Sequence, residues 1–259
     1  MGCFDSCLRC LSLVPWASLI AAVLCWAGTA LFCGTAHEAV SNSYILLNST
    51  DFYWNETSTD TIIQNFKYSI YGIAAFMFVL SILLFVDGIL STRVVKSDYE
   101  EGCKTSCCGL CIGIFYTMLV YICGVGWLLI TCFAAFPIHF FIVANSQCKA
   151  NTCIDFRQTG ILPAHLPDDI GRICGDDLTK FCSTPTFNVT YQLYIVAFAG
   201  AAITLLSMKQ FLMCLSANFA YLKMTKKLAV YEDTKYREEM ELNDIINTAR
   251  SNERLTYKY

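Results

Sequence analysis

The sequence predicts an all-α integral membrane protein, a four-transmembrane-helix bundle with cytosolic N- and C-termini and a disulfide-stapled second extracellular loop. Three observations lead to this prediction. Apolar residues gather into four long blocks, positive charge marks alternate connecting segments, and the sixteen cysteines divide into groups that would face opposite sides of a membrane. Only 15% of the 259 residues are charged, against about 25% in soluble domains.

Each apolar block can supply the roughly 20 residues that a helix needs to cross about 30 Å of hydrocarbon. The predicted spans are residues 13–34, 68–90, 111–143 and 194–222. The third block exceeds one span, so we expect it to tilt, or to continue past the membrane and bend near Pro137. A cleaved signal peptide is the alternative for the first block, but that block is longer than a signal peptide's apolar region.

The connecting segments alternate between the two sides of the membrane. A leader, a middle loop and a tail are expected in the cytosol, at residues 1–12, 91–110 and 223–259. The outer loops are residues 35–67 and 144–193. Lysine and arginine flank the spans in the middle loop and the tail, whereas the first outer loop has neither before its last residue. The positive-inside rule therefore sets this orientation.

Glycosylation sequons and four cysteines agree with the assigned outer side. The sequons begin at Asn48, Asn55 and Asn188, all in outer loops. Disulfides persist in the oxidising outer compartment, and four cysteines there permit three pairings. We expect the second outer loop to be a small stapled subdomain and the first to be open, polar and glycosylated. The four cysteines are Cys148, Cys153, Cys174 and Cys182.

The cysteines at the cytosolic surface are candidates for S-acylation, which would hold short cytosolic segments against the leaflet. Free thiols and a zinc site are the alternatives, although adjacent cysteines in so short a loop strain a zinc tetrahedron. The first six residues also fit the N-myristoylation pattern, with Gly2 as acceptor. The candidate acylation sites are Cys3, Cys7, Cys10, Cys108 and Cys111, with Cys103 and Cys107 beside them.

Two charged residues fall within predicted spans, Asp87 in the second and Lys209 in the fourth. An intramembrane charge is costly and suggests function. Both are expected toward the cytosolic side, where they could pair between helices. Alternatively, Lys209 could extend its stem to the headgroups.

Small residues one helical turn apart permit close helix contact in two of the spans. They are Gly109 with Gly113, and Ala197 with Ala201. The spacing supports packing in general and no particular partner.

The tail alternates charges and lacks proline and glycine, which favours a solvated helix leaving the membrane. Arg237 could pair with Glu241 at i, i+4. The tail would either bind a cytosolic scaffold or cytoskeletal protein, or serve only as a soluble extension.

No phosphate-binding loop, zinc-protease motif or convincing nucleophile occurs, and no basic stripe suggests nucleic acid. We therefore expect no enzyme activity, no cofactor, no metal and no nucleic-acid partner.

Seven stretches, in order along nearly the whole chain, carry a resemblance to a known family. The chain resembles the myelin proteolipid protein family, and its long charged tail is similar to that of the neuronal membrane glycoprotein branch. The stretches are Gly2–Cys10 with the following LSLVPWASLIA, Cys33–Ala39, Tyr68–Ala74, Arg157–Ile161, Ile173–Gly175, Ile195–Gly200 and Leu215–Tyr221.

The resemblance implies nested disulfides, Cys148 with Cys182 and Cys153 with Cys174, and acylation of the leader. Ser6 departs from the family pattern, because relatives carry a cysteine there. An acidic residue at the position of Asp87 is usual in the family, whereas an apolar residue is usual at that of Lys209.

The residues and the resemblance together favour a non-enzymatic structural or interaction protein of the plasma membrane, in neuronal or glial processes. The family implies roles in neurite or filopodium outgrowth or in myelin-like membrane apposition. The expected partners are a cholesterol-rich bilayer, a cytosolic scaffold and a second copy of the chain. The alternative is a channel or transporter subunit that uses Lys209 and Asp87.

Overall fold

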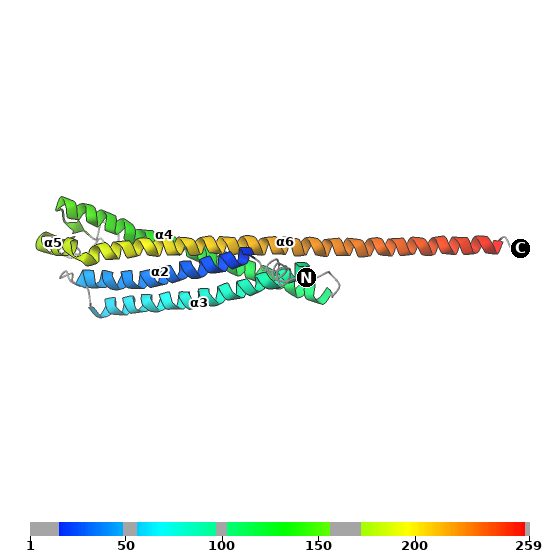
Figure 1. Ribbon diagram of the computed structural model, residues 1–259, viewed down its shortest axis with the longest axis horizontal. Helices are drawn as coiled ribbons and strands as arrows, with labels where there is room; N and C mark the ends of the chain where they lie inside the picture. The colour runs from blue at the N-terminus through cyan, green and yellow to red at the C-terminus, as the bar shows by residue number, and fades with distance from the viewer. Residues whose placement is uncertain (1–15, 49–55, 97–102, 156–171, 257–259) are drawn as a thin grey trace, which may run out of the picture.

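The protein is a bundle of long helices with a small two-stranded ladder at one end (Figure 1). The computed structural model describes residues 16–48, 56–96, 103–155 and 172–256, apart from some side chains within the helices. The elements are α2 (Trp16–Asn48), α3 (Glu56–Lys96), α4 (Cys103–Ala150), β1 (Ile154–Asp155), β2 (Arg172–Ile173), α5 (Gly175–Ser183) and α6 (Pro185–Thr256).

Four of these helices are long and apolar enough to cross a membrane, which confirms the predicted fold class. The qualifying stretches are Trp16–Leu46, Ile63–Ile89, Cys111–Ala150 and Pro185–Arg250. In Figure 1, α2, α3 and α6 lie side by side, with α4 partly behind α6.

The helices extend well past the predicted spans, so the described parts of the predicted first outer loop are helical. Helix α2 continues to Asn48, and α3 begins at Glu56, so most of this segment is helical. Neither glycine nor proline occurs between Gly34 and Gly72, so no residue type that ends a helix stands in the way. Hydropathy marks where a chain can enter lipid, and it does not indicate how far a helix continues beyond the lipid.

Helices α2 and α6 approach each other closely at Gly28 and Gly200. A methyl group added to Gly28 would lie 2.6 Å from Thr204 Oγ1 and 2.7 Å from the Thr204 backbone nitrogen. One added to Gly200 would lie 2.6 Å from the Phe32 backbone nitrogen. The two backbones therefore touch, a contact that only glycine allows. We call this contact, from Gly28 and Phe32 to Gly200 and Thr204, the glycine crossing.

Tryptophan side chains connect α3 and α4 to the pair of helices that meets at the glycine crossing. The Trp26 indole of α2 donates a hydrogen bond to Ser81 Oγ of α3. The Trp127 indole of α4 donates to the Met77 sulfur of α3 at 3.2 Å, and its ring meets Phe32 edge-on at 5.3 Å. The bundle core thus joins all four long helices. Helix α4 also passes through Pro137 without ending there.

The two predicted small-residue pairs differ in how closely their residues pack. Ala197 and Ala201 are buried in the core, as close packing requires. An added methyl group at Gly113 would meet nothing within 4 Å, so this glycine makes no close helix contact.

Helix α6 extends far beyond the bundle, in agreement with the predicted tail helix (Figure 1). The expected Arg237–Glu241 pair is wrong, however. Arg237 pairs instead with Asp233, one turn earlier, at 3.2 Å, and Lys235 pairs with Glu239 at 3.8 Å. Both interactions are exposed i, i+4 pairs, which support a solvated helix only weakly.

Candidate functional site

Two nested disulfides hold the end of the bundle that is predicted to face outside. Cys148, in the last turn of α4, is joined to Cys182 in α5, and Cys153 is joined to Cys174. This is the pairing that the resemblance implies. We call residues 148–155 and 172–183 the outer subdomain. Closing loops of 34 and 21 residues removes unfolded-state entropy worth about 3 to 4 kcal/mol per bond.

A short antiparallel ladder lies directly beside the inner disulfide. Ile154 pairs with Ile173 and Asp155 with Arg172. Both isoleucines are buried, and Arg172 Nε lies 3.9 Å from Asp155 Oδ2. Because the inner disulfide closes this ladder at one end, a two-stranded ribbon that would be marginal alone is held in register.

An aromatic cluster joins the outer subdomain to the helices. Phe187 of α6 packs against Phe141 of α4 at 5.1 Å and Phe181 of α5 at 5.4 Å, measured between ring centroids. The Tyr194 hydroxyl of α6 lies 2.9 Å from Ser43 Oγ of α2. The outer ends of α2, α4, α5 and α6 therefore form one packed unit.

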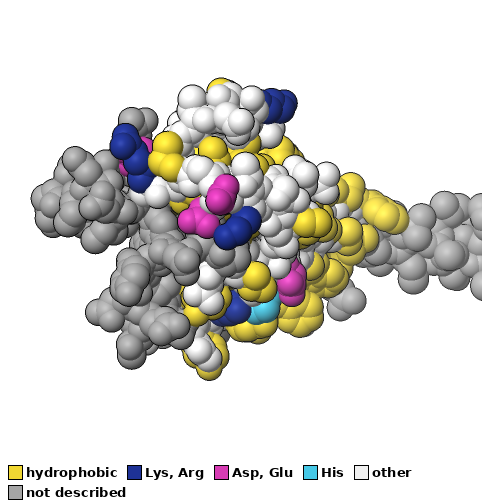
Figure 2. Space-filling view, turned by 90° about the vertical axis from the view of Figure 1, so that its left-hand side faces the viewer, with side chains coloured by type: hydrophobic (Ala, Val, Ile, Leu, Met, Phe, Trp, Pro, Cys, Tyr) yellow, Lys and Arg dark blue, Asp and Glu magenta, His cyan; other side chains and the backbone are white. Residues whose placement is uncertain are grey.

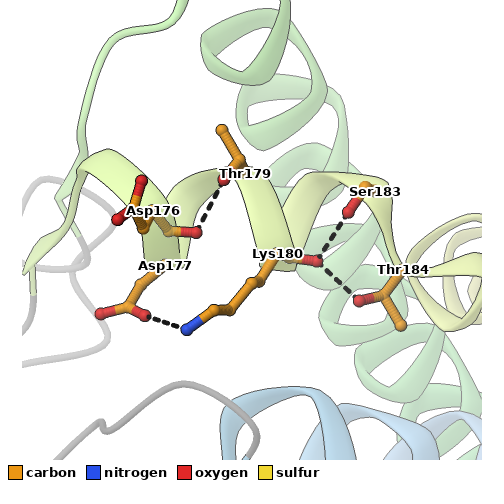
Figure 3. Close-up of polar contacts among 6 residues, drawn as sticks. All are labelled: Asp176, Asp177, Thr179, Lys180, Ser183 and Thr184. Carbon is orange, nitrogen blue, oxygen red and sulfur yellow. Dashed lines mark hydrogen bonds and ion pairs between the residues drawn. The ribbon is translucent and has the colours of Figure 1, made fainter.

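Helix α5 buries Leu178 and Phe181, and its polar side chains interact with one another (Figure 3). Lys180 Nζ contacts Asp177 Oδ1 at 3.3 Å, and the Thr179 hydroxyl donates to the Asp176 carbonyl at 2.7 Å. The Thr184 hydroxyl donates to the Lys180 carbonyl at 2.6 Å, next to the Ser183 hydroxyl. The Lys180 carbonyl also accepts the Thr184 backbone N–H at 3.2 Å, so several bonds converge where α5 ends.

Seen end-on, the described surface there is a mixture of charged and polar groups, with apolar surface extending behind it (Figure 2). Such a polar, rigid end suits contact with water, sugars or another protein rather than with lipid. No group of three metal-ligating side chains occurs in the described part of the chain.

The predicted glycosylation sites fall in different settings. Asn48 is exposed at the last residue of α2, and Asn188 is exposed in the first turn of α6. The Thr190 hydroxyl of the Asn188 sequon is buried and donates to the Thr186 carbonyl at 2.6 Å. Asn55 lies outside the described residues, and glycosylation at all three remains a prediction.

The predicted lipid-modified residues lie mostly outside the described part of the chain. Gly2, Cys3, Cys7 and Cys10 are not described, nor is the side chain of Cys108. Cys111 is exposed on α4 at the start of its apolar stretch, a position compatible with acylation.

The two intramembrane charges do not form the expected pair within the described structure. Lys209 is exposed on α6, on the same face as the exposed Leu206 and Met213 and away from the buried Thr204. Asp87 is partly buried on α3, and no ion pair of the described residues includes either side chain. Lys209 therefore lines no path between the helices.

Sequence reasoning missed the glycine crossing, because Gly28 and Gly200 are single glycines without a second one a turn away. The sequence of the first span did contain a pattern that could have predicted a close helix contact. Small residues recur there at every fourth position, and all of them are buried in the structure: Ala21, Cys25, Thr29 and Cys33.

The architecture defines a multi-pass membrane protein with a disulfide-stapled end. The model of the family "Myelin proteolipid protein (PLP or lipophilin)" matches residues 4–227. No solved structure matches the chain.

Curated relatives cover nearly the whole chain. Neuronal membrane glycoprotein M6-a of Rattus norvegicus is 41% identical over 98% of this chain and 94% of its own length. Neuronal membrane glycoprotein M6-b of Mus musculus is 39% identical, over 98% and 80%. Proteolipid protein DM beta of Squalus acanthias is 41% identical, over 98% and 94%.

The chain belongs to the myelin proteolipid protein family, as the resemblance indicated. Members of this family are structural membrane proteins and not enzymes, which confirms the expectation that the chain is no enzyme. The four apolar helices and the relatives identify a multi-pass plasma-membrane protein of neural cells.

Proposed function

We propose that this protein is a structural and interaction protein that organises cholesterol-rich membrane and supports outgrowth of neurites or filopodia, or myelin-like apposition of membranes. One observation carries the proposal. Helix α6 is continuous from Pro185, beside the outer subdomain, to Thr256 at the end of the tail. At 1.5 Å per residue its 72 residues extend about 108 Å, several times the thickness of a bilayer's hydrocarbon core.

A continuous helix can couple two interaction surfaces that a membrane separates. At one end, Phe187 holds α6 against α4 and α5 within the aromatic cluster. At the other end, the side chains from Lys223 to Arg250 whose exposure is described are mostly exposed, and 12 of these 28 residues are charged. A contact made outside the cell would thus share one rigid element with a contact made in the cytosol.

The lipid-facing surface supports an association with ordered membrane. Helix α4 exposes large apolar side chains along much of its length, as a surface in contact with acyl chains should. They include Phe115, Met118, Ile122, Phe133 and Phe136. Acylation of Cys111 and of the leader would add saturated chains next to this surface, which favours cholesterol-rich lipid.

The tail supports binding of a cytosolic scaffold or cytoskeletal protein. Its exposed ion pairs, Arg237 with Asp233 and Lys235 with Glu239, leave apolar residues such as Leu242 and Ile245 open to a partner. A partner helix or groove that contacts this stretch would connect the bundle to the cell cortex.

The test measures protrusions on neural cells that express equal surface amounts of each variant. Removal of residues 228–259 should abolish the increase in filopodia over untransfected cells. Ala229→Pro breaks α6 between the span and the tail but keeps the rest of the tail sequence. This substitution should strongly lower the number of filopodia, because proline costs about 3 kcal/mol inside a helix. Ala229→Ser is the matched control. A tail-less protein that induces as many protrusions as the full chain would refute the proposed coupling.

The channel or transporter alternative is not supported by the position of Lys209, which faces away from the bundle core. Ion flux in reconstituted vesicles that Lys209→Leu abolishes would restore that alternative.

A further inference from the structure

Lys209 lies where a membrane protein rarely leaves a cation. The exposed Leu206 and Met213 flank it, one turn away on either side, at 61% and 58% exposure. Within the described structure Lys209 has no hydrogen-bond or ion-pair partner. This face of α6 would therefore bring an unpaired positive charge into contact with lipid, which is costly.

Lys209 lies too far along α6 from the cytosolic headgroups for its ammonium group to reach them easily. Lys223, the first of the cations that mark the predicted cytosolic boundary, comes 14 residues later. At 1.5 Å per residue this is about 21 Å along the helix. The four-carbon stem of a lysine covers only a small part of that distance. Lys209 thus requires a negative partner near its own depth.

Asp87 on α3 lies within about 10 Å of that depth, as contacts of α2 with α6 and with α3 show. Thr204 of α6 is level with Gly28 of α2, and Ser81 of α3 is level with Trp26. Counting 1.5 Å per residue, the contact of Ser81 places Asp87 about 5 Å nearer the cytosol than Lys209, and the contact of Cys33 Sγ with the Ile70 carbonyl places it about 10 Å nearer. A flexible lysine side chain and the aspartate side chain together can bridge such an offset.

Asp87 is only partly buried, and its neighbours Leu83 and Val86 on α3 are exposed, so its side chain is reachable from outside the bundle. The side chains of Asp87 and Lys209 are therefore both accessible from the lipid-facing surface, yet they form no ion pair within one chain.

We propose that Lys209 of one copy pairs with Asp87 of a second copy, and that the reciprocal pair forms at the same time, in a symmetric dimer within the membrane. Two copies inserted with the same orientation can be related by a two-fold axis only if that axis runs along the membrane normal. Such a rotation keeps every residue at its depth, and it makes each contact occur twice. Each pair must therefore bridge an offset of about 5 to 10 Å along the membrane normal, which the long lysine side chain and the carboxylate of Asp87 would span together.

Charge exchange between copies tests this arrangement directly. The full chain is reconstituted in phosphatidylcholine–cholesterol vesicles as donor-labelled and acceptor-labelled copies, and association is measured by energy transfer at fixed protein-to-lipid ratio. Asp87→Lys copies carry two lysines at the contact, and Lys209→Asp copies carry two aspartates. Each variant alone should associate at least about tenfold more weakly than wild type, because both contacts become like-charged. A mixture of the two variants should associate as well as wild type, because each of the two contacts then joins a lysine of one variant to an aspartate of the other.

The mixture separates this proposal from an ion pair within one chain. An intrachain pair would be restored only by placing both substitutions in the same chain, and mixing the two single variants would then have no effect. That result would overturn the proposal, as would wild-type protein that stays monomeric.

Neutral variants keep the test valid if a charge reversal prevents folding. Asp87→Asn and Lys209→Met remove the attraction without adding repulsion, so each should weaken association about tenfold. Lys223→Met, a change to an exposed cation beyond the proposed contact, is the matched control. Equal association of wild type and both neutral variants would also overturn the proposal.

Discussion

Helices α2 and α4 are similarly apolar, but they are packed very differently. In its most apolar window α2 has 44% of its residues buried within the protein, against 11% for α4. The difference follows from side-chain size. Helix α2 presents Gly28 to α6 and carries a column of small buried residues, whereas α4 carries large exposed residues such as Phe133 and Phe136. In lipid, where apolar attraction between helices is weak, close backbone approach decides which helices pack.

The largest expected effect comes from filling the glycine crossing. Gly28→Leu should destabilise the bundle by more than about 3 kcal/mol, because an added Cβ would already overlap backbone atoms that have no room to move. Thermal unfolding in mild detergent measures the change. Gly34→Leu on the same helix is the control, since an added methyl group there meets nothing within 4 Å. Equal destabilisation by both substitutions would show that α2 and α6 are not in backbone contact.

Breaking the outer disulfide should have a large but local effect. Replacing both Cys148 and Cys182 by serine should cost the outer subdomain about 3 to 4 kcal/mol and expose α5 to proteases. The glycine crossing lies elsewhere along α2 and α6 and should keep its hydrogen-exchange protection. Loss of protection at Gly28 and Gly200 in the same variant would mean that the outer end and the crossing fold as one unit.

The smallest expected effect concerns the hydroxyl contact between α2 and α6. Tyr194→Phe and Ser43→Ala should each cost about 1 kcal/mol, since each removes one partner of a part-buried hydrogen bond. The double variant should cost little more than either single one. Fully additive costs in this double-mutant cycle would show that the two side chains do not interact.

The sequence was sufficient to predict the number of spans and the place of the disulfides. Blocks of apolar residues are long enough to count, and Cys148 to Cys182 fall in one predicted outer loop. The pairing itself came from the family resemblance, because four cysteines permit three connectivities.

Helix ends and helix partners could not be predicted in the same way. Residues 35–48 are polar enough to resemble a loop, yet they continue α2 because no helix-breaking residue intervenes. The partner of Lys209 depends on which face of α6 turns inward, and that face is set by the contact of Gly200 with α2. Hydropathy carries no information about such rotation.

Labelling of introduced cysteines in intact neural cells tests most directly the claim that one helix joins an outer interaction surface to a cytosolic one. Asp176→Cys places an exposed thiol on α5, and Glu241→Cys places one on the tail of α6. A membrane-impermeant maleimide should label position 176 in intact cells and position 241 only after permeabilisation, over the wild-type background. Labelling of position 241 in intact cells would contradict the assigned orientation, and with it the proposed coupling across the membrane.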